Sequence, residues 1–177
     1  MNRPARKHSI LHVAASADIP AGSAEVYRLL ADYRAGHPRI IPPEFFRDFR
    51  LEAGGYGAGT VITFDMVILG RTQHLRALVS EPEPGRVLLE SYPDSGATTT
   101  FAVNPLGDER SRVTISTALP VRSGLSGAIE RALTGRFLRR VYTAELTLIA
   151  REIQRHQSAE VQKTIALPPP PRIARQR

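Results

Sequence analysis

Hydrophobic and polar positions alternate with a period of two over most of the first 120 residues, a pattern that predicts β-strands. The clearest example is the segment 60–69, in which Ile62, Phe64, Met66 and Ile68 share one face. Pro- and Gly-containing turns separate successive segments without an intervening helix, so neighbouring strands are expected to pair as antiparallel hairpins. About seven strands are predicted, at 10–19, 46–51, 60–69, 73–80, 86–92, 98–103 and 112–119.

A period of three to four residues replaces this alternation at two places. A short helix is expected after the first strand, beginning with Ser23 as its N-cap and placing Leu29 and Leu30 on one face. The prolines of the following segment, 37–46, restrict it to a turn or two of helix or a loop crossing the mouth of the domain.

A second, much longer helix is predicted over residues 124–155, where apolar residues recur every three or four positions. Only a large curved sheet covers the apolar stripe of so long a helix. The sequence therefore predicts an α+β fold in which a curved antiparallel sheet wraps around the C-terminal helix. The predicted stripe consists of Leu125, Ile129, Leu133, Phe137, Val141, Ala144 and Leu148.

The net charge of +7 is concentrated at the two ends of the chain. Residues 1–7 and 156–177 carry +3 each, which leaves +1 for the body between them. Nucleic acid is therefore not an expected partner. The predicted organisation is a basic tail (1–8), one domain (9–155) and a basic, proline-rich tail (156–177) that is expected to be disordered.

The chain contains no cysteine, which excludes disulfides and thiolate chemistry, and a cytoplasmic location is expected. No apolar run reaches the roughly 20 residues of a membrane span, so no stable membrane insertion is expected. The sequence GGYGAG lies between two strands and is expected to form a hairpin turn rather than a dinucleotide site. No metal and no cofactor are expected, because no ligand spacing links the five histidines His8, His12, His37, His74 and His156.

With these elements placed, the chain resembles the SRPBCC or START-like helix-grip superfamily over roughly residues 9–155. The superfamily includes START-like lipid-binding domains, the major birch-pollen allergen and polyketide cyclase/dehydrase-like proteins. The resemblance rests on ADIPAGSAEVYRLLADY, GAGTVITFDM, EPEPGRVLLE and RRVYTAELTLIARE. It implies a cavity between the sheet and the last helix that receives a lipid- or polyketide-like molecule, with the segment after the first helix bordering the entrance.

Candidate ligand-binding residues follow from this arrangement, and no catalytic residue is assigned. Tyr33 and His37 are placed near the entrance, and the inner wall is expected to contain Phe64, Met66, Ile68, Leu75, Leu89, Tyr92, Phe101, Ile115, Leu133, Phe137 and Val141. Asp65, His74, Arg76 and Arg136 are expected to face solvent.

Three classes of function remain open at this point. The first is binding of a hydrophobic or amphipathic small molecule, with affinity from apolar burial. The second is a polyketide cyclase or dehydratase using the same cavity, which requires a titratable group on the inner wall. The third is an interaction protein whose basic tails and helix face reach an acidic partner or membrane surface. The sequence does not predict the oligomeric state.

Overall fold

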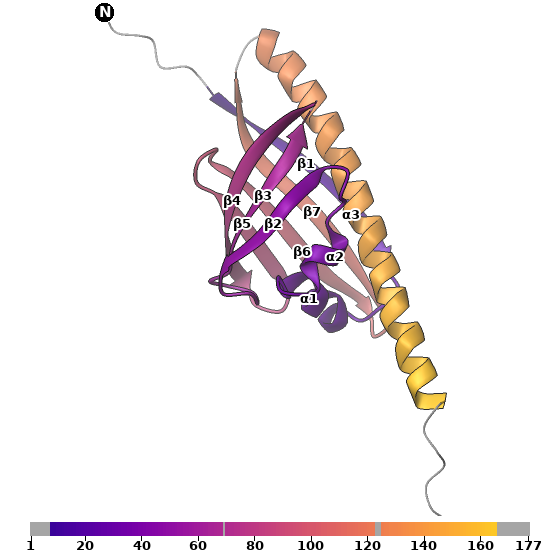
Figure 1. The fold of residues 1–177 in the computed structure, drawn as a ribbon. Helices are drawn as coiled ribbons and strands as arrows, with labels where there is room; N and C mark the ends of the chain where they lie inside the picture. The colour runs from indigo at the N-terminus through magenta and orange to yellow at the C-terminus, as the bar shows by residue number, and fades with distance from the viewer. Residues whose placement is uncertain (1–7, 69, 123–124, 166–177) are drawn as a thin grey trace, which may run out of the picture.

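A seven-stranded antiparallel sheet curls around one long helix in the computed structural model, which describes residues 8–68, 70–122 and 125–165 (Figure 1). This confirms the predicted helix-grip fold. The strands are β1 (His8–Ile19), β2 (Phe46–Ala53), β3 (Val61–Ile68), β4 (Arg71–Glu83), β5 (Val87–Tyr92), β6 (Ala97–Gly107) and β7 (Arg110–Arg122). The helices are α1 (Ser23–Ala31), α2 (His37–Ile40) and α3 (Leu125–Ile165).

The sheet has the order β1-β7-β6-β5-β4-β3-β2, and every neighbouring pair is antiparallel. Strands β2 to β7 therefore form a meander of hairpins, as predicted. The first strand is the exception, because it pairs with the last one, from His8 opposite Arg122 to Ile19 opposite Ser111. This pairing brings the beginning of the described chain beside the strand that leads into α3 (Figure 1).

The GGYGAG segment forms the connection between β2 and β3, as predicted for a hairpin turn. Gly55 shows why glycine is needed there. Its φ is 122°, and a Cβ atom at this position would lie 2.5 Å from Nε of Arg34. The backbone conformation therefore strains any other residue, and the side chain of Arg34 would have to move to make room for it.

Side chains on the inner face of the sheet are close-packed at one end only. There, α1 and α2 cover the curl and α2 contacts α3 (Figure 1). The core at this end contains side chains with 2% of their surface exposed or less, from the sheet and from all three helices. They include Ile19, Leu30, Ile40, Ala77, Leu88, Val103, Val113, Ile115, Ile149 and Ile153.

The long helix differs from its prediction in length and in its buried face. It continues to Ile165, ten residues beyond the predicted end at 155. Ile129 and Leu133 were predicted to face the sheet, yet 63% and 48% of their surfaces are exposed. Because an α-helix has 3.6 residues per turn, a series spaced by four drifts about 40° around the axis at each step. Val141 of the predicted stripe is fully buried. The buried stripe contains Leu138, Val141, Tyr142, Glu145, Leu146, Ile149, Glu152 and Ile153.

Smaller corrections concern the ends of the chain and of α1. The N-cap of α1 is Gly22 rather than Ser23, and its carbonyl accepts hydrogen bonds from the backbone N–H groups of Glu25 and Val26. Residues 1–7 of the predicted N-terminal tail and residues 166–177 of the proline-rich tail lie outside the described residues. Within the described ranges, no helix combines the length and the hydrophobicity of a membrane span.

Candidate functional site

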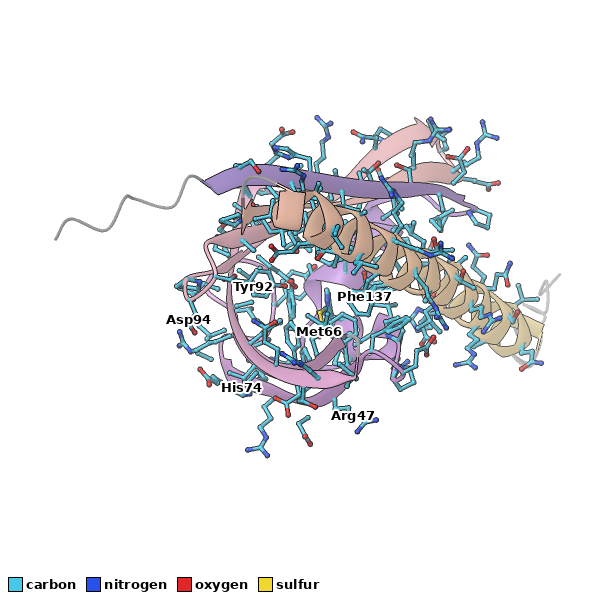
Figure 2. All side chains as sticks on the ribbon, turned by 90° about the horizontal axis from the view of Figure 1, so that it is seen from above. Arg47, Met66, His74, Tyr92, Asp94 and Phe137 are labelled. Carbon is cyan, nitrogen blue, oxygen red and sulfur yellow. The ribbon has the colours of Figure 1, made fainter. Side chains whose placement is uncertain are left out.

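A cavity of about 380 Å³ lies between the inner face of the sheet and the first half of α3. In β4, β5, β6 and β7, the inward positions near one end pack in the core, and those farther along the same strand line the cavity. In β6, for example, Val103 belongs to the core, Phe101 belongs to the core and also lines the cavity, and Ala97 and Thr99 line the cavity. Figure 2 shows Met66, Tyr92 and Phe137 pointing into the curl, while Arg47, His74 and Asp94 point away from it.

Aromatic and aliphatic side chains form most of the wall. The Phe64 ring packs edge-on against Phe46 and Tyr92, with ring centroids 5.3 and 6.3 Å apart. On the helix side, Phe137 makes a similar contact with Phe45 at 5.5 Å. These contacts fix the aromatic rings, and the remaining apolar surface is available to a ligand that fills the space.

A buried carboxylate, Glu90 of β5, interrupts this apolar wall. It occupies the inward phase of its strand, between Leu88 and Tyr92, and only 3% of its surface is exposed. The hydroxyl of Tyr33 donates to Oε1 at 2.8 Å, and the hydroxyl of Tyr92 donates to Oε2 at 2.6 Å. Burial, together with the neighbouring Glu90 charge, raises the pKa of both tyrosines. Their hydroxyls thus remain donors to Glu90.

His37, at the first position of α2, faces the same carboxylate. Its ring stacks on Tyr33 with centroids 4.2 Å apart, and its Nδ1 lies 2.8 Å from the carbonyl oxygen of Leu30. Nδ1–H donation to that oxygen leaves Nε2 unprotonated in the neutral ring, and Nε2 lies 3.7 Å from Oε1 of Glu90. Burial lowers the pKa of His37, although the Glu90 charge and the Leu30 carbonyl oppose this effect. The neutral ring therefore presents a second acceptor beside the carboxylate.

A chain of hydroxyl groups lies on the other side of the polar cluster. Tyr142 of α3 donates to Oγ1 of Thr117, which is 2.7 Å from Oγ1 of Thr99. All three residues line the cavity, and burial raises the pKa of Tyr142. The chain links α3 to β7 and β6 at the cavity wall.

Glu145, one turn beyond Tyr142, is the second buried carboxyl group of the cavity. Only 7% of its surface is exposed. No hydrogen bond or ion pair joins its side chain to another of the described residues. Burial raises the pKa of Glu145 well above its usual range, and the nearby Glu90 raises it further. This environment favours the protonated acid, which can donate a hydrogen bond into the cavity.

Within the described part of the chain, three residues of the cavity wall carry a carboxyl group. They are Glu90, Glu145 and Glu130, the last of which is exposed. The described lining contains no lysine or arginine. Within the described ranges, moreover, no group of three or more His, Asp or Glu side chains is arranged to hold a metal ion.

The structure brings eight of the thirteen predicted ligand-binding residues to the cavity wall. They are His37, Phe64, Met66, Ile68, Leu75, Tyr92, Phe101 and Phe137. Tyr33 and His37 are predicted to lie near the entrance, and both side chains are buried, with 0% and 4% of their surfaces exposed. Tyr33 does not line the cavity; it lies behind the wall, bonded to Glu90 and stacked on His37.

Four other predicted wall residues lie elsewhere. Leu89 is on the outer face, opposite Ser80 in the neighbouring strand, because the inward phase of β5 is that of Leu88 and Glu90. Leu133 is exposed on α3, for the reason of helical drift given above. Ile115 and Val141 are fully buried in the packed core and do not reach the cavity.

The four residues that are expected to face solvent all point away from the cavity. Asp65 and His74 pair with each other at 2.8 Å, and Arg76 pairs with Glu52 at the same distance. Arg136 is exposed on α3. None of these residues lines the cavity.

Sequence reasoning missed the polar residues Glu90, Thr99, Thr117, Tyr142 and Glu145. A signal for Glu90 exists in the segment LLESY, where strict alternation places it in phase with Leu88 and Tyr92. A signal for Glu145 exists as well, since it lies four residues before Ile149 and seven after Leu138 on one helix face.

Comparison with known proteins places this geometry in context. The family model for polyketide cyclase / dehydrase and lipid transport matches residues 11–154. No curated protein sequence matches the chain.

Several solved structures share the fold. The solution structure of KanY protein has a TM-score of 0.72 at 23% identity, covering 82% of this chain and 99% of that one. The Zhui aromatase/cyclase from Streptomyces sp. R1128 has a TM-score of 0.66 at 19% identity, covering 83% and 95%. A START superfamily protein from Mycobacterium smegmatis has a TM-score of 0.62 at 15% identity, covering 82% and 99%. At such identities these structures share the fold alone.

Proposed function

The chain belongs to the polyketide cyclase / dehydrase and lipid transport family, and we propose that it binds one compact, amphipathic small molecule in the cavity between the sheet and α3. The observation that carries this proposal is the cavity itself, with its largely aromatic and aliphatic wall and its polar cluster. Its volume of about 380 Å³ lies toward the lower end of the roughly 300–1,000 Å³ typical of ligand pockets. A ring system or a short chain therefore fits better than a two-chain lipid.

Apolar burial supplies the affinity in this proposal. Each Å² of apolar surface removed from water contributes roughly 25 cal/mol. The rings of Phe64, Phe101 and Phe137 lie on the cavity wall, and the first two are nearly fully buried. Their fixed positions reduce the entropy lost when a ligand binds.

A second candidate function is a cyclase- or dehydratase-type reaction in the same cavity. One observation favours it: His37 and Tyr92 lie on the inner wall and both contact Glu90, with Glu145 on the opposite helix. Two carboxyl groups in different environments are the usual basis of acid–base catalysis. The protonated Glu145 would act as the acid and Glu90 as the base. The Zhui protein is named as an aromatase/cyclase, and this chain shares its fold.

Native mass spectrometry of the protein purified from its own host tests the binding function. We expect a retained small-molecule mass that disappears when the cavity is filled by Ala97→Phe. Ala102→Phe is the matched control. It makes the same change on the same strand, but Ala102 lies on the outer face of the sheet and does not line the cavity. A retained mass unaffected by Ala97→Phe, or no retained mass and no binding of small hydrophobic probes, would contradict the proposal.

A further inference from the structure

The charge of the cavity points to the chemical class of its ligand. Two of its three carboxyl groups, Glu90 and Glu145, are more than nine-tenths buried, and the described lining has no lysine or arginine to balance them. An anionic ligand would place a further negative charge beside the Glu90 carboxylate without a counter-charge and would oppose ionisation of Glu145, which is costly in a buried site. The charge therefore disfavours carboxylate and phosphate ligands.

The hydrogen-bond donors and acceptors of the cavity wall restrict the chemical class of the ligand further. The hydroxyl protons of Tyr33 and Tyr92 are already donated to Glu90, and that of Tyr142 is donated to Thr117. Nε2 of His37 faces Oε1 of Glu90 at 3.7 Å, so two acceptors lie opposite each other with no donor from the described residues between them. The groups around Glu90 thus present acceptors whose donors are already used, and a ligand that is complementary to this part of the cavity supplies donors.

Glu145 has no hydrogen-bond partner among the described residues, and its protonated carboxyl becomes a second charged acceptor once it loses its proton. Its carboxyl lies on the helix side of the cavity, and Glu90 lies on the sheet side. The electrostatic neighbours of Glu145 are Glu90 and Tyr92 from β5 and Tyr142 from its own helix. None of these neighbours is a cation. A buried carboxyl group in such surroundings gains most from a positive charge brought by the ligand.

We propose that the ligand carries a protonated amine on a compact apolar body, with the ammonium group held between Glu90 and Glu145 and beside Nε2 of His37. This inference rests on the proposed binding function and specifies the ligand class for that site. A primary ammonium group brings one positive charge and three donors, which match the acceptors that the cavity presents. A neutral alcohol brings a single donor and no charge, so it satisfies the site only in part.

Binding of a cation also changes the protonation of the protein. The ammonium group stabilises the ionised form of Glu145 and so lowers its pKa, which burial and Glu90 hold high in the free protein. Amine binding is then accompanied by proton release from Glu145. A neutral ligand in the same cavity causes no such release.

Three probes with the same phenylbutyl body separate the effect of charge from that of hydrophobicity: 4-phenylbutylamine, 4-phenylbutanol and 5-phenylpentanoate. Calorimetric titration of the full chain gives the affinities, and titration in buffers of different ionisation enthalpy gives the protons released. The methyl group of Met66 reports occupancy of the cavity by NMR, since it lines the wall and the chain has only two methionines. We expect the amine to bind about tenfold or more tightly than the carboxylate, the scale of one charge-assisted hydrogen bond.

Variants assign the effect to the two glutamates. Glu90→Gln and Glu145→Gln should each weaken amine binding by about tenfold or more and should weaken alcohol binding by a smaller factor, because only the amine loses a charge-assisted contact. Glu145→Gln should also abolish the proton release. Glu109→Gln is the matched control, because Glu109 is exposed in the β6–β7 turn and does not line the cavity.

The outcomes separate this inference from the function on which it rests. If the alcohol shifts the Met66 resonance but the amine binds no more tightly than the carboxylate, the amine assignment is overturned and the binding function stands. Equal proton release in the wild type and in Glu145→Gln would overturn the role given to Glu145. If none of the three probes perturbs Met66, both the amine assignment and the proposed cavity function are wrong.

Discussion

Two buried glutamates on α3, seven residues apart on the same face, have opposite environments. Glu145 lies at the hollow end, lines the cavity and forms no ion pair with a described residue. Glu152 lies at the packed end, where Arg39 of α2 is 2.8 Å from its Oε1. Arg155 and His156 follow at 3.4 and 3.3 Å. The hydrogen bond from Arg39 lowers the pKa of Glu152, whereas burial and Glu90 raise that of Glu145.

The difference shows that burial alone does not decide the role of a carboxyl group. Both residues have more than 90% of their surface covered. Glu152 has cationic partners within the protein, and its bond to Arg39 fastens α2 to α3. Glu145 has none among the described residues, so its electrostatic interactions are available to a ligand. One end of the helix therefore contributes to stability, and the other contributes to the binding function that we propose.

The largest expected effect is on stability, and it comes from truncating side chains at the packed end and at the cavity end of the domain. Ile149, between the two glutamates, is fully buried in the packed core. Ile149→Ala should lower the free energy of unfolding by about 3 kcal/mol, because it leaves a new cavity in close-packed surroundings. Met66→Ala, at the hollow end, should cost about 1 kcal/mol, since Met66 already borders empty space and is only partly buried. Urea unfolding of both variants measures the difference, and equal costs would contradict the division into packed and hollow ends.

A smaller effect is expected for Glu152→Gln, which removes the charge that Arg39 pairs with. Because this arginine is about half exposed, the loss should be about 1 kcal/mol. The pKa of Glu152 is lower in the folded protein than its usual 4.5, so its contribution is present above pH 4.5 and is lost as the pH falls through the folded pKa. Thermal unfolding of the variant and the wild type should therefore differ at pH 7 and converge in acid. A constant difference at all pH values would contradict this account.

The smallest expected effect, and one of opposite sign, belongs to Glu145→Gln. The pKa of Glu145 is higher in the folded protein than its usual 4.5. Its contribution to stability is therefore full below pH 4.5 and is lost as the pH rises through the folded pKa. Relative to the wild type, the variant should gain a few degrees in Tm on going from pH 4.5 to 8. Loss of stability at pH 8 would show that Glu145 has a stabilising partner in the folded protein.

The sheet was predictable in detail because its signal is local. In β3 the alternation placed Ile62, Phe64, Met66 and Ile68 inward, and all four line the cavity. Each residue of a strand is assigned to a face by its immediate neighbours, so errors do not accumulate along the strand. The same rule would also have placed Leu89 outward had Glu90 been accepted as an inward residue.

The helix and the polar cluster were harder to predict, for two physical reasons. In a helix of 41 residues, a small error in the assumed periodicity becomes a large error in the face to which a residue is assigned. For this reason Leu133 was predicted to face inward and Leu138 was overlooked. Hydropathy also assigns glutamate to the surface, although Glu90 accepts hydrogen bonds from Tyr92 on its own strand and from Tyr33 in a distant part of the chain. The bond between Tyr33 and Glu90 spans 57 positions, and no local pattern predicts such a contact.

The pairing of β1 with β7 has a consequence for the order of assembly. The hydroxyls of Ser16 and Thr114, which are hydrogen-bonded across these strands, are 98 positions apart. The first strand therefore cannot pair with β7 until most of the sheet has been synthesised. During synthesis on the ribosome, the inner face of the meander stays uncovered until α3 has emerged. We therefore expect the protein to bind its ligand only after α3 has been synthesised. Nascent chains that stop before residue 125 should bind no ligand.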